Sequence, residues 1–278
     1  MANALSSGTA HGLVDITVIE DGIVSVVMSR PPVNAISRQM YAELREVFGG
    51  IEDEVPSARV LMLRGAGKHF CAGSDLGEFA EMTAANAVAR MRLVREAFAA
   101  IYECPVPTIA AVHGSALGAG TAIAACCDLV VCGESAMLGT PEVGVGVMGG
   151  GRHLARLVPE QEMRRMYFTG DAVPARDLLR FGGITSVVPD TELLPEALRL
   201  ARRIARHSGA VLRYAKKSLN RAEFLDLKSG YESEQETTVE LASHPDSIEA
   251  RKALVEHRPP VYLNSSREGV SEDPTASR

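Results

Sequence analysis

The hydrophobic and polar positions near the N-terminus predict a β-hairpin followed by a helix. Residues 14–20 and 23–29 are rich in β-branched side chains, and the Asp-Gly dipeptide between them is typical of a tight hairpin turn. Ser37, a common helix N-cap residue type, is followed by apolar side chains at helical spacing over residues 40–51. This spacing indicates an amphipathic helix after the hairpin.

Beyond this helix, short apolar runs alternate with helical patterns. We expect buried strands at residues 58–65, 108–114 and 128–133, and a long helix over residues 78–103. Strands that alternate with helices predict βαβ units and a mostly parallel sheet. The first part of the chain is therefore expected to have an α/β fold.

From about Pro159 onward the pattern is mainly helical. Helices are expected at residues 160–168, 174–181, 191–207, 210–222, 231–243 and 246–256, with one short strand near 184–188. We therefore divide the chain into a disordered lead-in (1–12), a β/α core (13–190), a helical C-terminal region (191–262) and a disordered polar tail (263–278).

The composition narrows the class of protein. The 278 residues are 46% hydrophobic, as in ordinary globular domains, and the formal charge of −6 argues against binding to nucleic acid or an anionic membrane. No apolar run approaches the roughly 20 residues of a membrane span, and no secretory signal is evident. The five cysteines lack a C-x-x-C pair, which favours buried free thiols over a metal site or disulfides. We expect a cytoplasmic protein without a metal centre.

Two glycine-rich turns share one design, because each carries a buried strand toward a helix. They are GAGKHFCAGSDL at residues 65–76 and GSALGAGTAI at 114–123. Such turns leave backbone N–H groups without carbonyl partners, and small side chains let a ligand approach them. Two such donors aimed at one point make an oxyanion hole, worth roughly 3–4 kcal/mol per donor. The alternative is that both turns are ordinary, tightly packed strand-to-helix connections.

Four motifs together resemble the enoyl-CoA hydratase/isomerase (crotonase) family over nearly the whole chain. They are PPVNAI (31–36), the two glycine-rich turns, and GTPEVGVG (139–146). The resemblance implies a crotonase-like spiral of ββα units with a helical C-terminal trimerisation region, and hence a homotrimer or a dimer of trimers. It also implies an acyl-CoA substrate, with coenzyme A as part of the substrate and no further cofactor.

The resemblance also implies roles for particular residues. The peptide N–H groups of Ala72 and Ala119 would hold the thioester oxygen, and Glu142 would be the acid/base. Residues expected to contact the substrate or its CoA moiety are Arg30, Lys68, Ala72, Gly73, Ser74, Asp75, Leu76, Gly118, Ala122 and Gly150.

One departure from the family's hydratases bears on the reaction. Those enzymes resemble one another in carrying two glutamates, and the first of them falls here at Ala122. Adding water requires one group to activate the water and another to supply the α-proton, whereas one carboxylate can carry a proton from carbon to carbon. We therefore expect double-bond isomerisation rather than hydration. The alternatives are hydrolysis, decarboxylation or C–C cleavage of an acyl-CoA, or acyl-CoA binding without turnover.

Other nearby residues could replace the missing carboxylate, and a second departure lies beside them. The candidates are Asp75, Glu78, Glu81, His113 and His153. The segment VMGGGRH (147–153) is shorter than the family's usual glycine loop and lacks its proline-glycine pair. This shortened loop is expected to alter the shape of the pocket.

Overall fold

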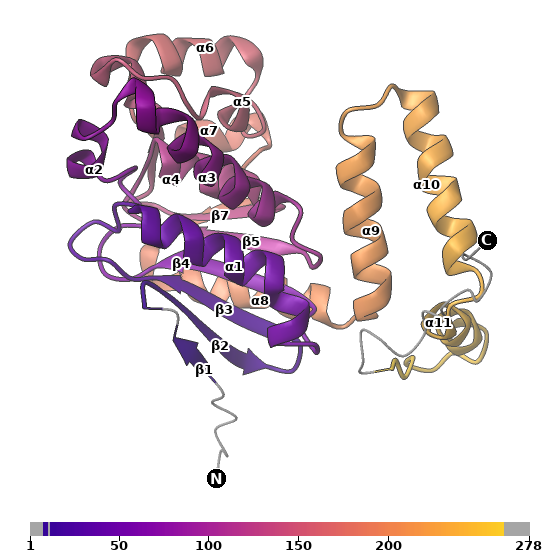
Figure 1. The fold of residues 1–278 in the computed structure, drawn as a ribbon. Helices are drawn as coiled ribbons and strands as arrows, with labels where there is room; N and C mark the ends of the chain where they lie inside the picture. Colours follow the sequence, from indigo (N-terminus) through magenta and orange to yellow (C-terminus); the bar gives the residue numbers. More distant parts are fainter. Residues whose placement is uncertain (1–7, 11, 264–278) are drawn as a thin grey trace, which may run out of the picture.

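A seven-stranded mixed sheet runs through the main body of the computed structural model, which describes residues 8–10 and 12–263 (Figure 1). The first three strands pair antiparallel with one another, and the third to the seventh pair parallel. In spatial order they are β1 (Gly8–Ala10), β2 (Val14–Glu20), β3 (Ile23–Met28), β4 (Val60–Gly65), β5 (Thr108–Val112), β7 (Leu129–Gly133) and β10 (Ser186–Val188). The predicted hairpin is confirmed. The buried strands expected after it and the mostly parallel sheet are confirmed as well.

A second, three-stranded sheet was not predicted. It contains β6 (Ser115–Leu117), β8 (Met137–Gly139) and β9 (Val173–Pro174), in that order. Its strands are only two or three residues long, so they carry no measurable alternation of apolar and polar positions. β6 lies inside the second glycine-rich turn, and the sheet therefore fixes the path of that turn.

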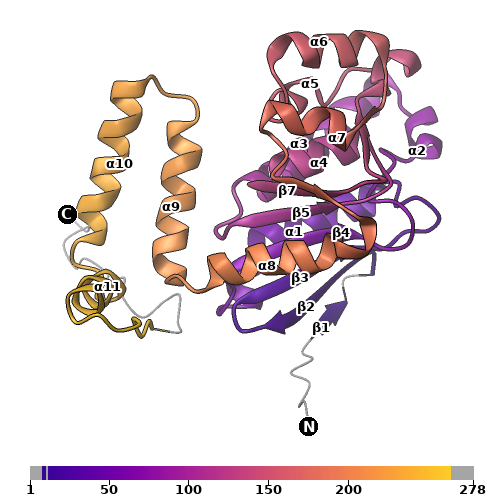
Figure 2. The same cartoon turned by 180° about the vertical axis from the view of Figure 1, so that it is seen from behind.

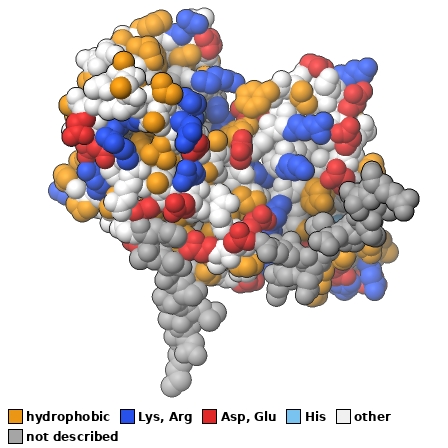
Figure 3. All heavy atoms as spheres, viewed as in Figure 1, with side chains coloured by type: hydrophobic (Ala, Val, Ile, Leu, Met, Phe, Trp, Pro, Cys, Tyr) orange, Lys and Arg blue, Asp and Glu red, His pale blue; other side chains and the backbone are white. Residues whose placement is uncertain are grey.

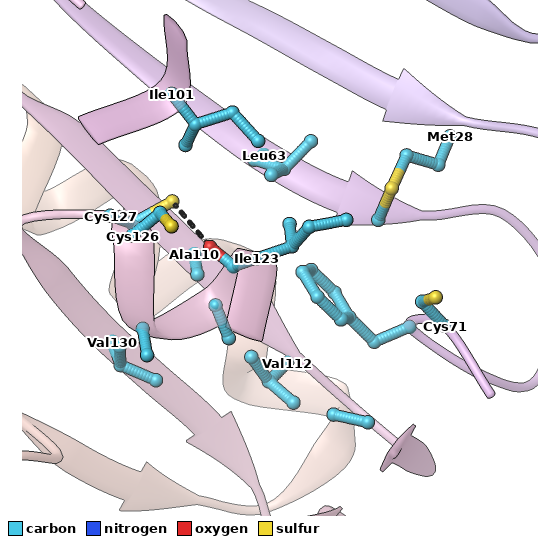
Figure 4. Packing of buried hydrophobic residues seen from close by; sticks show 14 of the residues in the cluster. Met28, Leu63, Cys71, Ile101, Ala110, Val112, Ile123, Cys126, Cys127 and Val130 are labelled. Carbon is cyan, nitrogen blue, oxygen red and sulfur yellow. Dashed lines mark hydrogen bonds between the residues drawn. The ribbon is translucent and has the colours of Figure 1, made fainter. Parts of the chain in front are cut away.

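Helices α1 (Arg38–Glu54), α3 (Ala84–Tyr102) and α4 (Ala119–Cys126) cover one face of the large sheet (Figure 1). α1 begins at the predicted N-cap, because the Ser37 hydroxyl accepts a hydrogen bond from the Met40 N–H. α4 is buried along nearly its whole length. Figure 4 shows Ile123 and Cys126 of α4 among strand side chains, and the Cys127 thiol donates to the Ile123 carbonyl oxygen. All five cysteines are buried free thiols, as predicted.

Helix α8 (Leu193–Ala205) covers the opposite face of the sheet (Figure 2). Its buried side chains, including Ala197 and Ala201, pack against Val60 and Ile109 of the central strands. Helix α8 is the first helix of the C-terminal region expected over residues 191–262, and it packs directly on the core sheet.

Helices α9 (Gly209–Ala222), α10 (Leu227–Leu241) and α11 (Pro245–Val255) extend away from the main body (Figures 1 and 2). α9 is joined to the core by Lys216, whose ammonium lies 2.6 Å from both carboxylate oxygens of Asp128. Asp128 also accepts a hydrogen bond from the Thr108 N–H at 2.7 Å. These contacts connect the end of α4 to the C-terminal helices.

The shorter elements complete the chain. They are α2 (Leu76–Ala80), η1 (Pro141–Val145), α5 (Gly151–Leu154), α6 (Glu160–Thr169), α7 (Ala175–Leu178), η2 (Leu179–Phe181) and η3 (Asp190–Glu192). The single helix expected over residues 78–103 is divided into α2 and α3, because Thr83 forms a capping box with Asn86 and starts a new helix. Among the described residues, no helix is long and apolar enough to cross a membrane.

The predicted lead-in requires one correction. Residues 8–10, expected to be disordered, form β1, which pairs antiparallel with β2 in the register Gly8 to Thr17. Their backbone groups complete the edge of the large sheet. The rest of the predicted lead-in before Gly12, and the tail after residue 263, lie outside the described residues.

Candidate active site

A cavity of about 300 Å³ lies between the two glycine-rich turns, the loop around residues 141–150, and helices α1 and α3. It is lined mainly by apolar side chains. It brings together nine of the residues expected from the sequence: Ala72, Gly73, Ser74, Leu76, Gly118, Ala119, Ala122, Glu142 and Gly150. The convergence of these separate segments on one space is the central feature of the site.

The two glycine-rich turns are hydrogen-bonded side by side. The Cys71 N–H donates to the Ser115 carbonyl oxygen and the Leu117 N–H donates to the Cys71 carbonyl oxygen, both at 3.0 Å. Gly120 allows this approach, because a Cβ at that position would lie only 2.1 Å from the Cys71 carbonyl oxygen. Gly120 therefore allows the backbones of α4 and the first glycine-rich turn to pack closely together.

The structure corrects the expected donor in the first turn. The Ala72 N–H donates to the Val33 carbonyl oxygen at 3.0 Å, so it is not free to bind a ligand. The Gly73 N–H is also engaged, with the Cys71 sulfur at 3.4 Å. The Ser74 N–H has no hydrogen-bond partner among the described residues, and Ser74 lines the cavity.

Backbone pairing explains why Ser74 is the residue left free. It forms a parallel β-bridge with Ile36, in which the Ile36 N–H donates to the Gly73 carbonyl and the Asp75 N–H donates to the Ile36 carbonyl. Successive backbone N–H groups of an extended chain point in opposite directions. The Ser74 N–H is consequently directed away from residue 36.

In the second turn the expected donor is available. Gly118, with φ of 54°, is the N-cap of α4, and Ala119 is its first helical residue. The first N–H groups of a helix have no partner within it, and the Ala119 N–H has none elsewhere among the described residues. The Gly118 N–H, by contrast, donates to the Gly139 carbonyl oxygen at 2.8 Å. The amides of Ser74 and Ala119 thus border one cavity.

Glu142 lines the same cavity as these amides, and its carboxylate lies near Gly118. A Cβ added at Gly118, Gly149 or Gly150 would lie 3.1, 3.6 or 3.4 Å from its Oε1, so the shortened glycine loop passes close to this carboxylate. Its Oε2 is buried without a hydrogen-bond partner among the described residues. Burial raises the pKa of Glu142 above its ordinary value, an effect partly opposed by a backbone hydrogen bond. A raised pKa favours the use of a carboxyl group as a general acid or base.

The position of the missing glutamate lies in the same cavity. Ala122 follows Ala119 by one helical turn, is fully buried and contributes to the cavity lining. Glu142 is the one carboxylate among the described residues that line the cavity. None of the candidate replacements lines it.

Each candidate replacement has another environment. Asp75 caps α2 and pairs with Arg30, and Glu78 accepts from the Arg38 N–H at 3.0 Å. Glu81 is largely exposed. The His113 ring nitrogen lies 3.0 Å from the Gly67 carbonyl oxygen, and the His153 ring packs edge-on against Phe98, with centroids 5.1 Å apart. Burial lowers the pKa of His153.

Three of the residues expected to contact the substrate do not line the cavity. The Arg30 Nη2 lies 2.6 Å from an Asp75 carboxylate oxygen, and its Nη1 donates to the Ala35 carbonyl at 2.9 Å. Arg30 and Asp75 therefore hold the first turn in place. Lys68 is exposed and borders a separate depression that also contains His113.

Two polar residues of the cavity were not singled out from the sequence. The Tyr41 hydroxyl lies 2.9 Å from the Ser74 hydroxyl, and the Arg90 guanidinium is nearly fully buried. Tyr41 follows Met40, which lies on the predicted apolar face of α1, and this position was the sequence signal that could have indicated its burial. Arg90 stands within the long helical pattern of residues 78–103, where periodicity alone does not distinguish it from its charged neighbours.

Comparison with known proteins agrees with this geometry. A sequence profile of the enoyl-CoA hydratase/isomerase family matches residues 18–265. The chain belongs to this family. The crotonase-like α/β fold is also confirmed, because an enoyl-CoA hydratase from Bacillus anthracis superimposes with a TM-score of 0.85 at 29% identity, covering 91% of this chain and 100% of that one. As a member of this family, the protein is an enzyme of acyl-CoA chemistry.

Two similar relatives carry the same printed name, (7aS)-7a-methyl-1,5-dioxo-2,3,5,6,7,7a-hexahydro-1H-indene-carboxyl-CoA hydrolase. The protein from Rhodococcus jostii is 37% identical, over 90% of this chain and 96% of its own length. The protein from Mycobacterium tuberculosis is 38% identical, over 86% of this chain and 97% of its own length. Members similar to this chain thus include both a hydratase and CoA hydrolases.

Proposed function

We propose that the enzyme moves a double bond within an acyl-CoA thioester, with Glu142 as its proton carrier. The observation that carries this proposal concerns the described residues: Glu142 is the one carboxylate that lines a mainly apolar cavity, and two backbone amides without partners among these residues belong to Ser74 and Ala119 of the same lining. Buried Ala122 supplies no second acid/base group for the addition of water. The proposed oxyanion donors are therefore the amides of Ser74 and Ala119, whereas the sequence indicated those of Ala72 and Ala119.

The reaction needs one proton transfer in each direction. The Glu142 carboxylate removes a proton from C2 of a 3-enoyl thioester, and the electron pair of that C–H bond moves into the thioester, leaving negative charge on its oxygen. The Ser74 and Ala119 N–H groups donate to this oxygen more strongly in the transition state than in the ground state. Protonated Glu142 then returns the proton to C4, and the double bond forms between C2 and C3. These steps use no metal or redox cofactor.

A second candidate is hydrolytic C–C cleavage of an acyl-CoA with a ketone at C3. It is favoured by the two relatives named as hydrolases of a dioxo-substituted acyl-CoA. Water deprotonated by Glu142 would add to the ketone carbon, the C2–C3 bond would break, and its electron pair would remain on C2 as the thioester enolate. Protonation of C2 by Glu142 would complete the cleavage. Both reactions therefore use the same oxyanion donors.

Three substrates distinguish these reactions. With 3-hexenoyl-CoA, isomerisation increases the absorbance of the conjugated thioester, whereas hydration of crotonyl-CoA decreases it. With 3-oxohexanoyl-CoA, cleavage yields acetyl-CoA and butyrate, which are separable by chromatography. We expect the fastest turnover with 3-hexenoyl-CoA. Faster release of acetyl-CoA from the oxo-ester would favour the second candidate and contradict the first.

Glu142→Gln tests the proton carrier directly. We expect this variant to lose turnover while it retains CoA-ester binding, because the amide keeps the shape of the side chain but cannot carry the proton. Glu81→Gln is the matched control, since Glu81 is exposed and lies outside the cavity. Undiminished activity of Glu142→Gln would remove Glu142 from its proposed role.

We also propose that the chain assembles as a homotrimer or a dimer of trimers through its C-terminal helices. This region exposes many large apolar side chains, among them Phe224, Leu227, Tyr231, Val239 and Leu254. Hydrophobic side chains (orange) are visible on these helices in Figure 3. Light scattering should give three or six times the chain mass of 29.6 kDa, and a monomer would contradict the proposal.

A further inference from the structure

Arg90 is the one cation among the described residues that line the active-site cavity. It projects from α3, and only 6% of its side chain is exposed. A charged side chain that is buried in a mainly apolar cavity must be compensated by hydrogen bonds or by an opposite charge. The partners of its three nitrogen atoms therefore decide what the cavity can hold.

One edge of the guanidinium is already occupied. Nη1 donates to the Glu78 carbonyl oxygen at 3.0 Å and lies 3.4 Å from a carboxylate oxygen of Glu78. The Phe79 ring lies 5.1 Å from the central carbon of the guanidinium. The Glu78 carboxylate is shared, because it also accepts from the Arg38 N–H and lies 3.7 Å from the Arg38 Nε. Glu78 thus fixes the orientation of Arg90 without using its other edge.

The other edge has no partner. Nε and Nη2 are both buried, and neither forms a hydrogen bond with any of the described residues. These two nitrogens direct parallel N–H groups to the same side of the guanidinium, a fork that matches the two oxygens of a carboxylate. A buried charged donor that lacks a partner is unfavourable, so a ligand that supplies two oxygens gains affinity here.

We propose that this edge of Arg90 binds a carboxylate at the far end of the acyl group, so that the substrates are CoA half-thioesters of dicarboxylic acids. The inference rests on the proposed function, since it places the acyl chain in the same cavity. Met91, Val94 and Phe98 of α3 also line the cavity and provide apolar surface for the intervening methylene groups. A plain acyl chain would leave the Arg90 fork unpaired, so its CoA ester should bind more weakly than the dicarboxylic ester of the same length.

Binding of saturated CoA esters tests this inference without any turnover. Calorimetry would compare succinyl-, glutaryl-, adipoyl- and pimeloyl-CoA with butyryl-, pentanoyl-, hexanoyl- and heptanoyl-CoA, which match them in length. For at least one length we expect the dicarboxylic ester to bind at least ten-fold more tightly. Arg90→Gln should abolish this preference, and Arg90→Lys should restore part of it because the charge returns without the fork.

Arg92→Gln is the matched control, because it removes the same charge from the same helix at a side chain that is 75% exposed. It should retain the preference. The assignment of Arg90 is overturned if no length shows a preference, if Arg90→Gln retains it, or if 5-oxohexanoyl-CoA binds more tightly than adipoyl-CoA. Failure of the unmodified enzyme to bind either series would instead overturn the proposed function.

Discussion

The hydroxyl oxygen of Tyr41 lies 2.9 Å from the hydroxyl oxygen of Ser74, which links helix α1 to the first glycine-rich turn. Burial raises the pKa of Tyr41, so the phenol remains protonated over the working pH range. The hydrogen bond orients the residue whose N–H is free to bind the thioester oxygen. In the proposed mechanism Tyr41 would therefore be a positioning residue for the oxyanion hole.

Tyr41→Phe should lower kcat about five-fold, in line with a hydrogen bond worth about 1 kcal/mol, and leave CoA-ester affinity nearly unchanged. The ring keeps its packing against Phe98, so the melting temperature should change little. Tyr102→Phe is the control, because its hydroxyl binds Glu223 away from the cavity. An equal loss in both variants, or a rise in KM without a change in kcat, would contradict a positioning role.

Ala119→Pro removes one oxyanion donor with little change to the helix. Proline is favoured at the first position of a helix, which Ala119 occupies in α4, and it has no N–H. We expect kcat to fall roughly 10²–10³-fold, the usual effect of deleting one such donor. Stopped-flow absorbance with 3-hexenoyl-CoA measures this loss, and thermal unfolding checks the fold.

Ala119→Gly serves as the comparison for the proline variant. It retains the N–H and should retain most of the activity, because the alanine methyl does not take part in the chemistry. If both variants lost activity equally, the side chain of residue 119 would matter rather than its backbone amide. The oxyanion role of this residue would then be wrong.

Local signals in the sequence predicted the main elements and the segments of the site. The N-cap at Ser37, the hairpin and the two glycine-rich turns depend on neighbouring residues, and each is present. The donor in the first turn was misassigned, because the free N–H is determined by pairing between Ser74 and Ile36, 38 positions apart. The place of Arg90 in the cavity likewise depends on how α3 packs, which helical periodicity does not specify.

Ala122→Glu tests whether the missing carboxylate alone would account for the weak hydration that we expect of the unmodified enzyme. The new carboxyl group would project from α4 into the cavity that contains Glu142, and the pair could then activate water and supply the α-proton. We expect hydration of crotonyl-CoA to rise at least ten-fold over the unmodified enzyme. Ala122→Gln controls for volume and should show no gain.

An equal effect of glutamate and glutamine at position 122 would show that no second acid/base group had been created. Absence of any gain in a folded glutamate variant would instead point to the shortened loop at residues 147–153. Gly149 and Gly150 of that loop lie close to the Glu142 carboxylate and line the cavity. Hydration by these variants therefore distinguishes the effect of the missing glutamate from the effect of the shortened loop.

The raised pKa of Glu142 predicts opposite pH effects on activity and stability. The base form carries out the first step, so kcat/KM should fall about ten-fold per pH unit once the pH is below this raised pKa. Since the folded state holds this proton more tightly than the unfolded state, the stability contribution is greatest below the ordinary value of 4.5. It is lost as the pH rises through the folded-state pKa.

Glu142→Gln removes this buried charge and should therefore stabilise the fold at high pH. We expect its melting temperature at pH 8 to exceed that of the unmodified enzyme by about 1–3 °C, corresponding to a fraction of a kcal/mol up to about 1 kcal/mol. The difference should shrink toward zero below pH 4.5, where Glu142 is neutral in both states. Scanning calorimetry at several pH values measures it. A pH-independent difference would mean that Glu142 releases its proton at the same pH in the folded and unfolded states, which would contradict its raised pKa.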